Sequence, residues 1–238
     1  MKRIIPNLLY NGNYAVKGKN YRKHKYVGDL LNTVKLFNEL EVDELIISNI
    51  GTSVDFELLH KVASQAFMPV TYAGQITDTE LAKKIINCGF EKVGLNSLYF
   101  NDIEETKKII DTLGAQSVSL SLNIKKDIFG RRIVAYNSLR SKKRDFDAVL
   151  KELQNLEIGD LIFNSVSHEG LVNGVDVSLI DILNEYRFKG LALYSGGVNS
   201  KKDFDYIVNS TLDGAVCGRS FIFKGKHDAV LINKPKLI

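Results

Sequence analysis

The segment Tyr72-Ala73-Gly74-Gln75-Ile76 recurs in the second half of the chain as Tyr194-Ser195-Gly196-Gly197-Val198, 122 residues further on. A second segment, residues 92–97, is echoed by residues 215–220 at a separation of 123 residues. Because two different segments recur at nearly the same distance, the second half of the sequence repeats the first. We therefore expect one domain over residues 1–238, made of two halves at about 1–115 and 116–238.

Eight short apolar runs organise the whole chain, and most of them are preceded by an amphipathic stretch with helical spacing. Such continuous runs are typical of parallel strands that are buried on both faces. Strands that alternate with helices indicate a parallel sheet, and eight units predict an α/β fold, the (β/α)8 TIM barrel with internal half-barrel duplication. An open Rossmann-like sheet is the less favoured alternative, because no Gly-x-Gly-x-x-Gly follows the first run. The expected strands are residues 3–9, 44–49, 68–74, 92–97, 117–123, 160–166, 190–197 and 214–220.

The first and fifth expected strands are each followed by a long insertion. Strand one lies 114 residues before strand five, and strand two lies 116 residues before strand six, so the insertions occupy equivalent places in the two halves. The insertions contain Gly12-Asn13 and Gly130-Arg131, residue types that favour tight turns. We therefore expect a hairpin in each insertion, on the face where such barrels carry their chemistry.

The composition excludes several classes of protein. Of the 238 residues 45% are hydrophobic and 25% are charged, as in an ordinary globular domain, and the net charge of +4 is too small to indicate a nucleic-acid partner. No apolar run approaches the roughly 18 residues of a membrane span, and the start lacks a signal-peptide core, so we expect a cytoplasmic protein with no membrane contact. Cys88 and Cys217 lie beside glycines near apolar segments, which predicts buried free thiols. We expect neither a metal site nor a cofactor.

The expected ends of strands seven and eight are rich in glycine. They read Ser195-Gly196-Gly197 and Gly218-Arg219-Ser220. Barrels often bind phosphate with the loops after these two strands, because backbone N–H groups there approach the anion closely. We therefore predict a phosphate site to which Arg219 adds charge, although glycines that only make tight turns are the alternative. The related segment in the first half carries the bulky Gln75, which argues against a second phosphate there.

Carboxylates are scarce at the other expected strand ends. Leu9, Asn49 and Asn123 stand where a barrel that transfers protons would place Asp or Glu. His168 and Glu169 form the one adjacent pair at a strand end with a titrating side chain for such work. A solvated loop that caps the next helix is a slightly favoured reading of this pair, so the catalytic residues stay unassigned.

Several segments resemble, in order and with barrel spacing, the cyclase subunit of imidazole glycerol phosphate synthase. The resemblance extends to about Phe223. It implies that a partner glutaminase, a class I glutamine amidotransferase, supplies ammonia through the barrel interior. The family's barrel uses this ammonia to cleave and cyclise a phosphoribosyl substrate on the way to histidine. The matching segments are residues 2–6, 16–18, 42–45, 91–93, 114–118 and 195–197.

The resemblance implies that the family's chemistry is altered at the mouth of the barrel. The family's two essential aspartates, at the ends of strands one and five, fall on Leu9 and Asn123, which transfer no protons. Further family aspartates fall on Asn49 and Glu169, and the family's last phosphate-site serine falls on Arg219. A phosphorylated small molecule remains an expected partner. Counting the positions that match the family and the strand ends, the expected binding residues are Lys17, Asn96, Ser97, Gly170, Ser195, Gly196, Gly197, Gly218 and Arg219.

The opposite end of the barrel keeps the family's pattern. There a ring of charged residues closes the entrance for ammonia, and the matching residues are Arg3, Glu44, Lys92 and Asp160. A charged group that points into a barrel loses several kcal/mol of hydration free energy unless it is paired. Two acids and two bases at this place are therefore expected to pair with each other. A structural salt-bridge plug is the alternative to an ammonia gate. Glu91 matches a family position that contacts the glutaminase.

The tail after Ser220 leaves little room for the family's long last helix. Together with Leu8-Leu9 and residues 26–29, it resembles a paralogous group associated with surface-polysaccharide genes, in which the barrel is thought to supply ammonia to a sugar amidotransferase that makes acetamidino sugars. We therefore expect an ammonia conduit to an acceptor enzyme. One alternative is a divergent cyclase, a lyase subunit of histidine biosynthesis that uses His168 or Glu169, and another is a phosphate-sugar binding module. Whether the barrel is itself an enzyme stays open.

Overall fold

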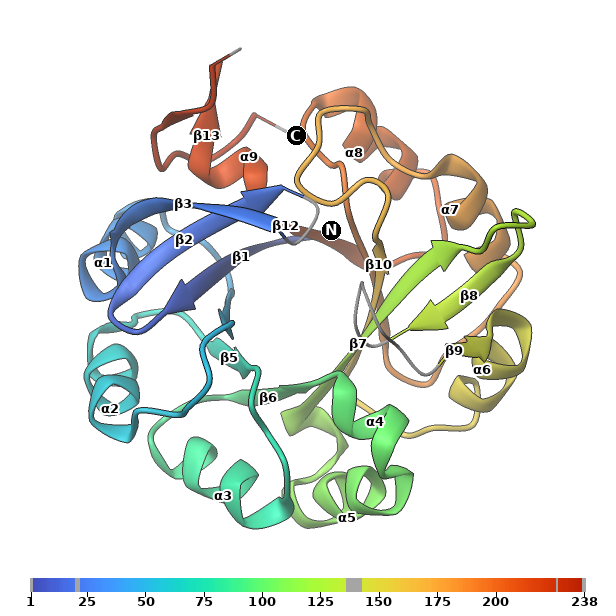
Figure 1. The fold of residues 1–238 in the computed structure, drawn as a ribbon, viewed down its shortest axis with the longest axis horizontal. Helices are drawn as coiled ribbons and strands as arrows, with labels where there is room; N and C mark the ends of the chain where they lie inside the picture. The colour runs from blue at the N-terminus through green and yellow to red at the C-terminus, as the bar shows by residue number, and fades with distance from the viewer. Residues whose placement is uncertain (1, 20–21, 136–142, 226, 237–238) are drawn as a thin grey trace.

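The computed structural model describes residues 2–19, 22–135, 143–225 and 227–236, and it is a closed parallel barrel surrounded by helices (Figure 1). Each barrel strand is hydrogen-bonded to two parallel neighbours, and the pairing of the sixth strand with the fifth closes the ring. The predicted TIM barrel is confirmed. Its strands are β1 (Arg3–Asn11), β4 (Leu45–Asn49), β5 (Val70–Ala73), β6 (Lys92–Leu95), β7 (Val118–Lys126), β10 (Asp160–Ser165), β11 (Leu191–Ser195) and β12 (Gly214–Cys217).

The strands differ from their predicted bounds for local reasons. Strands β1 and β7 run further than expected because each continues into a hairpin. Strands β6 and β12 end two or three residues early because short helices begin at Ser97 and Arg219. Strand β11 ends at Ser195 because Gly196 and Gly197 have φ values of 113° and 78°, which a strand does not accommodate.

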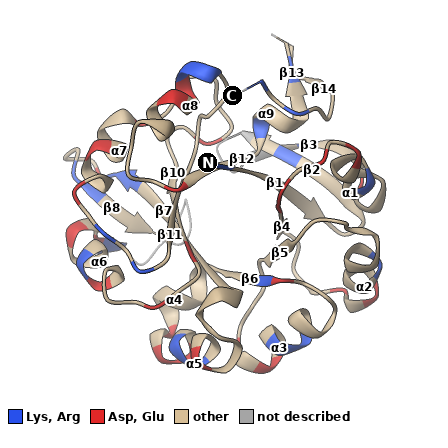
Figure 2. Cartoon of the chain, turned by 180° about the vertical axis from the view of Figure 1, so that it is seen from behind, with Lys and Arg blue, Asp and Glu red and all other residues tan. Residues whose placement is uncertain are grey.

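Helices cover the outside of the barrel, and charged residues lie mainly on these helices and on the loops (Figure 2). The periodic apolar residues of each helix face the strands, which leaves the polar face to solvent. In the described part of the chain, no helix combines the length and apolarity needed to cross a bilayer. The helices are α1 (Leu30–Glu39), α2 (Phe56–Gln65), α3 (Thr79–Asn87), α4 (Ser97–Asn101), α5 (Ile103–Leu113), α6 (Phe146–Leu153), α7 (Val177–Leu183), α8 (Lys201–Val208) and α9 (Arg219–Ile222).

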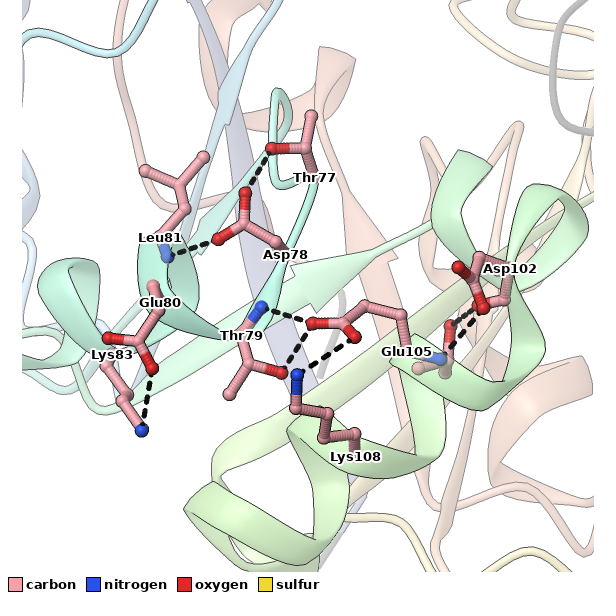
Figure 3. Close-up of polar contacts among 10 residues, drawn as sticks. Thr77, Asp78, Thr79, Glu80, Leu81, Lys83, Asp102, Glu105 and Lys108 are labelled. Carbon is pink, nitrogen blue, oxygen red and sulfur yellow. Dashed lines mark hydrogen bonds and ion pairs between the residues drawn. The ribbon is translucent and has the colours of Figure 1, made fainter.

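Acidic side chains begin several of these helices. The Asp78 carboxylate accepts from the Leu81 N–H at 2.9 Å and caps α3, and Asp102 caps α5 in the same way (Figure 3). Glu105, in the first turn of α5, accepts from both the N–H and the hydroxyl of Thr79 at 2.7 Å. These bonds satisfy exposed N–H groups and also tie the start of α3 to α5, which sets the spacing of the two neighbouring helices.

Both insertions are hairpins, as predicted. The first consists of β2 (Tyr14–Lys19) and β3 (Arg22–Asp29), and Gly12-Asn13 forms the two-residue turn between β1 and β2 with Gly12 at a φ of 56°. The second consists of β8 (Arg132–Ala135) and β9 (Lys143–Asp145), and residues 127–131 form the turn between β7 and β8. Both hairpins extend from the carboxyl ends of barrel strands.

The half-barrel repeat is visible in the backbone. In the first half Gly74 and Gln75 have φ values of 101° and 58°, and in the second half Gly196 and Gly197 have 113° and 78°. A left-handed conformation at a non-glycine residue such as Gln75 is uncommon and strained. The first half therefore keeps the backbone turn of the second although its last glycine has been replaced.

The interior of the barrel holds a small apolar layer, separate from the larger core between strands and helices. Five barrel strands each contribute one buried residue to it, and Ala73 packs against them. Cys88 and Cys217 are buried and free, as predicted, and burial raises the pKa of the Cys217 thiol to about 12. The five residues of the inner layer are Ile5, Ile46, Ile162, Leu193 and Val216.

The chain ends in a small hairpin instead of a long helix. Strands β13 (Phe223–Lys224) and β14 (Ala229–Val230) pair antiparallel, directly after α9. The segment that follows returns to α9, because the N–H groups of Leu231 and Asn233 donate to the carbonyl oxygens of Ile222 and Phe221 at 2.9 Å. This hairpin is called the C-terminal hairpin below.

Candidate functional site

The carboxyl ends of the barrel strands carry neutral amides and hydroxyls. The Ser48 hydroxyl donates to Asn7 Oδ1 at 2.8 Å, and Asn164 Nδ2 donates to Asn123 Oδ1 at 3.0 Å. Asn96 Nδ2 donates to the backbone carbonyl of Ser121 at 2.6 Å. Asn123 therefore lies within a hydrogen-bonded amide pair, and the side chains described in this layer of the mouth include no acid or base.

Leu9 lies near the end of β1, half-buried, where it is paired with Ser48 of β4 and Val16 of β2. Asn49 is the residue on which a further family aspartate falls. It is buried, and both ends of its side-chain amide are hydrogen-bonded within the protein. Its Nδ2 donates to the Ser53 carbonyl and the Tyr72 hydroxyl at 2.9 Å, and its Oδ1 accepts from the Gly51 N–H. Neither side chain has a titrating group for the mouth of the barrel.

A small hollow lies between the ends of β10, β11 and β12. Its lining includes five residues that the sequence selected: Gly170, Gly196, Gly197, Gly218 and Arg219. A side chain is excluded at the two central glycines, since a Cβ on Gly197 would stand 2.0 Å from the Gly174 carbonyl oxygen and one on Gly196 would stand 2.7 Å from that of Ser165. We call this hollow the glycine cradle; Ser195 precedes it at the end of β11, and Asn96 and Ser97 lie at the end of β6, outside its lining.

Lys17 reaches the glycine cradle from the first hairpin. Its side chain is 2% exposed, and its Nζ donates to Glu169 Oε1 at 2.9 Å. A Cβ added to Gly218 would lie 2.3 Å from the Lys17 ammonium, so the lysine occupies the space that the glycine leaves open. The structure therefore places Lys17 at the mouth, in an ion pair whose lysine is buried and whose glutamate is 21% exposed.

Arg219 was expected to add positive charge to the phosphate site, but its guanidinium is paired with a carboxylate of the protein. Its guanidinium is paired with the Asp228 carboxylate of the C-terminal hairpin and lies over the Phe223 ring, 5.3 Å from the ring centre. Within the described residues its buried Nη1 has no hydrogen-bond partner. The reason is that the C-terminal hairpin folds over the end of β12, so much of the positive charge expected at the cradle is already neutralised.

His168 lies in the loop after β10 and faces two hydroxyl groups. Its Nδ1 is 2.9 Å from Ser165 Oγ and 3.0 Å from Ser167 Oγ. The His168 side chain also lies against Gly197, since a Cβ added to that glycine would stand 3.2 Å from the His168 Cβ. Burial lowers the pKa of His168 below its usual value, which favours the neutral imidazole. The imidazole is thus held beside the glycine cradle by hydroxyl contacts.

Sequence reasoning missed a buried ion pair next to this histidine. Arg132 of the second hairpin forms a bidentate pair with Asp176 at 2.9 and 3.0 Å, and both side chains are about one-tenth exposed. Burial alone would raise the pKa of Asp176, but hydrogen bonds from Arg132 and Ser178 outweigh it and hold the pKa at about 2. The signal available in the sequence was the position of Asp176 as the cap of α7.

We expect the Asp176 pair to make stability fall in acid. The pKa is about 2 in the folded protein against 3.8 for an ordinary Asp, so the ionised carboxylate favours the folded state by about 2 kcal/mol above pH 4. This contribution is lost as the pH falls from about 4 towards 2. Chemical unfolding at pH 2 to 7 measures it, and Arg132→Leu should flatten this part of the profile; an unchanged profile in that variant would contradict the assignment.

The charged residues at the amino ends of the strands form two separate pairs. Arg3 Nη1 lies 2.6 Å from Glu44 Oε1, and Lys92 Nζ lies 2.7 Å from Asp160 Oδ2. The first pair is partly open, with the Arg3 side chain 43% exposed, whereas Lys92 and Asp160 are 14% and 5% exposed. The four residues of the expected ring thus pair acid with base, and the apolar inner layer lies above them in the barrel.

Over residues 2–19, 22–135, 143–225 and 227–236, no group of three or more His, Cys, Asp or Glu side chains is arranged to hold a metal ion. Among the described residues, the polar side chains at the mouth include Lys17, Glu169, His168 and several amides. Such a set can bind an anion, but its capacity for acid–base work is limited to Glu169 and His168.

Comparison with known proteins agrees with this architecture. The family model described as "Histidine biosynthesis protein" matches residues 3–228. The "Putative imidazole glycerol phosphate synthase subunit hisF3" of Vibrio vulnificus is 35% identical over 98% of this chain and 92% of its own length. The hisF2 protein of Pseudomonas aeruginosa, with the same form of name, is 34% identical over 98% and 96%. The "Imidazole glycerol phosphate synthase subunit HisF" of Petrotoga mobilis is 30% identical over 92% and 90%.

The family model covers nearly the whole barrel, and three relatives of 30% identity or more align over at least nine-tenths of both chains. The closed barrel, the glycine cradle and the charged pairs at its base lie within the matched residues. The chain therefore belongs to the histidine biosynthesis protein family, as a homologue of the HisF subunit of imidazole glycerol phosphate synthase.

Proposed function

We propose that this barrel pairs with a glutaminase, a class I glutamine amidotransferase, and conducts ammonia to an acceptor enzyme without carrying out the cyclisation itself. The observation that carries the proposal is the contrast between the two ends of the barrel. The charged pairs at the amino ends of the strands are complete, whereas Leu9 and Asn123, which transfer no protons, stand where the resemblance places the family's two essential aspartates.

The interior is suited to a small neutral molecule. Between the charged pairs and the amides of the mouth lies the layer of Ile5, Ile46, Ile162, Leu193 and Val216. An ammonium ion would lose its hydration in such a layer at a cost of several kcal/mol, whereas ammonia carries no charge. The Lys92–Asp160 and Arg3–Glu44 pairs are accordingly proposed as the gate at the entrance.

The proposed acceptor is a sugar amidotransferase of surface-glycan synthesis. Support comes from the tail and the first strand end, which resemble the paralogous group with that role, and from the C-terminal hairpin that replaces a last helix. The names of relatives from Vibrio vulnificus and Pseudomonas aeruginosa carry the numbered subunit designations hisF3 and hisF2, as expected of paralogues. The glutaminase would dock at the base of the barrel, where Glu91 is exposed.

The glycine cradle gives the proposal a second part, the binding of a phosphorylated small molecule. Backbone groups of Gly170, Gly196, Gly197 and Gly218 surround the hollow, and the Lys17 ammonium lies directly on Gly218. Glycines let an anion approach the backbone, and a buried lysine supplies the charge. Lys17 is paired with Glu169, so an incoming phosphate must compete with that carboxylate.

Two other functions have specific support. A divergent cyclase of histidine biosynthesis is favoured by the nearness of His168 and Glu169 to the glycine cradle. A phosphate-sugar binding module without catalysis is favoured by the same cradle, taken with the neutral amides of the mouth. The first predicts rescue of a histidine auxotroph, and the second predicts no association with a glutaminase.

The deciding experiment supplies the purified barrel with ammonium salt and the phosphoribosyl aminoimidazole substrate. We expect no imidazole glycerol phosphate, while the HisF subunit of Petrotoga mobilis in the same assay serves as the positive control. Product formation at a rate comparable to the control would overturn the conduit proposal in favour of the cyclase. In parallel, the tagged barrel should co-purify with a glutaminase from its own cells, and mass spectrometry should identify a sugar amidotransferase in the same fraction.

A further inference from the structure

The first hairpin places two lysines opposite each other. Lys17 on β2 and Lys25 on β3 are cross-strand partners in an antiparallel pair. Like charges directly opposite each other destabilise such a pair unless each is compensated separately. The Lys17 ammonium is compensated by Glu169, at 2.9 Å, whereas Lys25 is exposed and makes its contacts with the C-terminal hairpin.

The C-terminal hairpin compensates Lys25. The Lys25 Nζ donates to the backbone carbonyl of Asp228 at 2.9 Å and lies 5.6 Å from the centre of the Phe223 ring. The Arg219 guanidinium lies over the same ring and is paired with the Asp228 carboxylate. Phe223 and Asp228 therefore each interact with two cations, one from the first hairpin and one from the end of the barrel.

The C-terminal hairpin is itself anchored away from the first hairpin. The segment after β14 is hydrogen-bonded back to α9, and the Phe221 ring of α9 packs against Phe37 of α1, with ring centres 6.0 Å apart. Lys234 Nζ donates to the Glu41 carbonyl at 3.1 Å. The segment is thus fixed to the barrel on one side, which allows it to hold the first hairpin on the other.

We propose that the C-terminal hairpin is a latch that positions Lys17 over the glycine cradle, with Lys25, Phe223 and Asp228 as positioning residues for anion binding. Without the latch, the uncompensated Lys25 repels Lys17 and the hairpin moves away from Gly218. The inference rests on the anion site of the proposed function, because Lys17 serves that site. It adds that the C-terminal hairpin has a role in binding.

Phe223→Leu tests the latch without changing the net charge. The variant removes the ring that both cations share, and we expect inorganic phosphate to bind about tenfold more weakly in calorimetry. Phe223→Tyr keeps the ring and should bind as the unaltered protein does. Val230→Ala is the matched control, since Val230 is the cross-strand partner of Phe223 in the same hairpin and is exposed.

Hydrogen exchange separates positioning from a general loss of stability. In Phe223→Leu the backbone amides of β2 should exchange faster, while those of β6 and β7 on the far side of the barrel stay protected. Unchanged phosphate affinity together with unchanged β2 protection would overturn the latch. If the unaltered protein binds no phosphate, the anion site fails and the purpose assigned to the latch falls with it; faster β2 exchange in the variant would then still show that the C-terminal hairpin holds β2.

Discussion

Replacing Lys92 by methionine should lower the free energy of unfolding by about 3 kcal/mol, because it leaves the Asp160 carboxylate buried without its cation. Asp160 is 5% exposed and the Lys92 ammonium is 2.7 Å away, while the other carboxylate oxygen has no hydrogen-bond partner among the described residues. The burial of this pair therefore predicts a measurable loss of stability, which urea unfolding will quantify.

The double variant Lys92→Met with Asp160→Leu separates stability from ammonia transfer. Replacing a buried ion pair by apolar side chains is often neutral or stabilising, so the double variant should unfold close to the unaltered protein. With the glutaminase bound, however, it should yield less transferred ammonia per glutamine hydrolysed. Unchanged coupling in a stable double variant would remove this pair from the proposed gate.

The second charged pair is the matched control. Arg3 is 43% exposed, so its pairing with Glu44 is expected to stabilise the fold by less than about 1 kcal/mol. Arg3→Met should therefore shift the urea midpoint little. A loss as large as that of Lys92→Met would mean that exposure does not govern the strength of these pairs.

Lys17→Met and Glu169→Gln should change phosphate binding in opposite directions. Losing the Lys17 ammonium removes a charge-assisted contact and leaves Glu169 facing the anion, so binding should weaken about thirtyfold. Glu169→Gln removes the carboxylate that competes for Lys17, and binding should tighten about tenfold. Isothermal titration with inorganic phosphate at low salt measures both changes, since salt screens such contacts.

A change of charge far from the cradle controls for the general effect of net charge. Lys202 is exposed on α8, and Lys202→Met should leave phosphate affinity unchanged. Lys17→Arg keeps the charge but not the compact shape that fits against Gly218, so we expect an intermediate loss. If Glu169→Gln weakens binding instead, Glu169 contributes to the site by holding Lys17 in place and does not compete with the anion.

Much of the fold follows from local patterns in the sequence. Apolar runs, helical spacing and the repeat of residues 72–76 at 194–198 specify eight alternating units, because strand and helix periodicity is a property of short segments. Gly12-Asn13 predicts its hairpin for the same reason. The errors are local too: Ser97 and Arg219 begin short helices where the apolar pattern suggested that the strands continue.

The candidate site was predictable only in part. The strand ends identified Gly170, Gly196, Gly197 and Gly218, since topology alone brings the ends of neighbouring strands together. The partners of the charged side chains could not be predicted from the strand ends. Arg219 was expected to serve the anion, but the C-terminal hairpin folds back and pairs it with Asp228.

The sequence by itself determined the barrel, the position of its glycine-rich ends and the uncharged side chains at Leu9 and Asn123. Only the tertiary structure decided the ion pairs, such as Lys17 with Glu169 and Arg132 with Asp176, whose partners lie 152 and 44 residues apart. The physical reason is that the two kinds of interaction join residues at very different separations along the sequence. Periodicity and turn propensity act over a few neighbouring residues, whereas an ion pair depends on burial and distance, which arise when the barrel closes and the hairpins fold onto it.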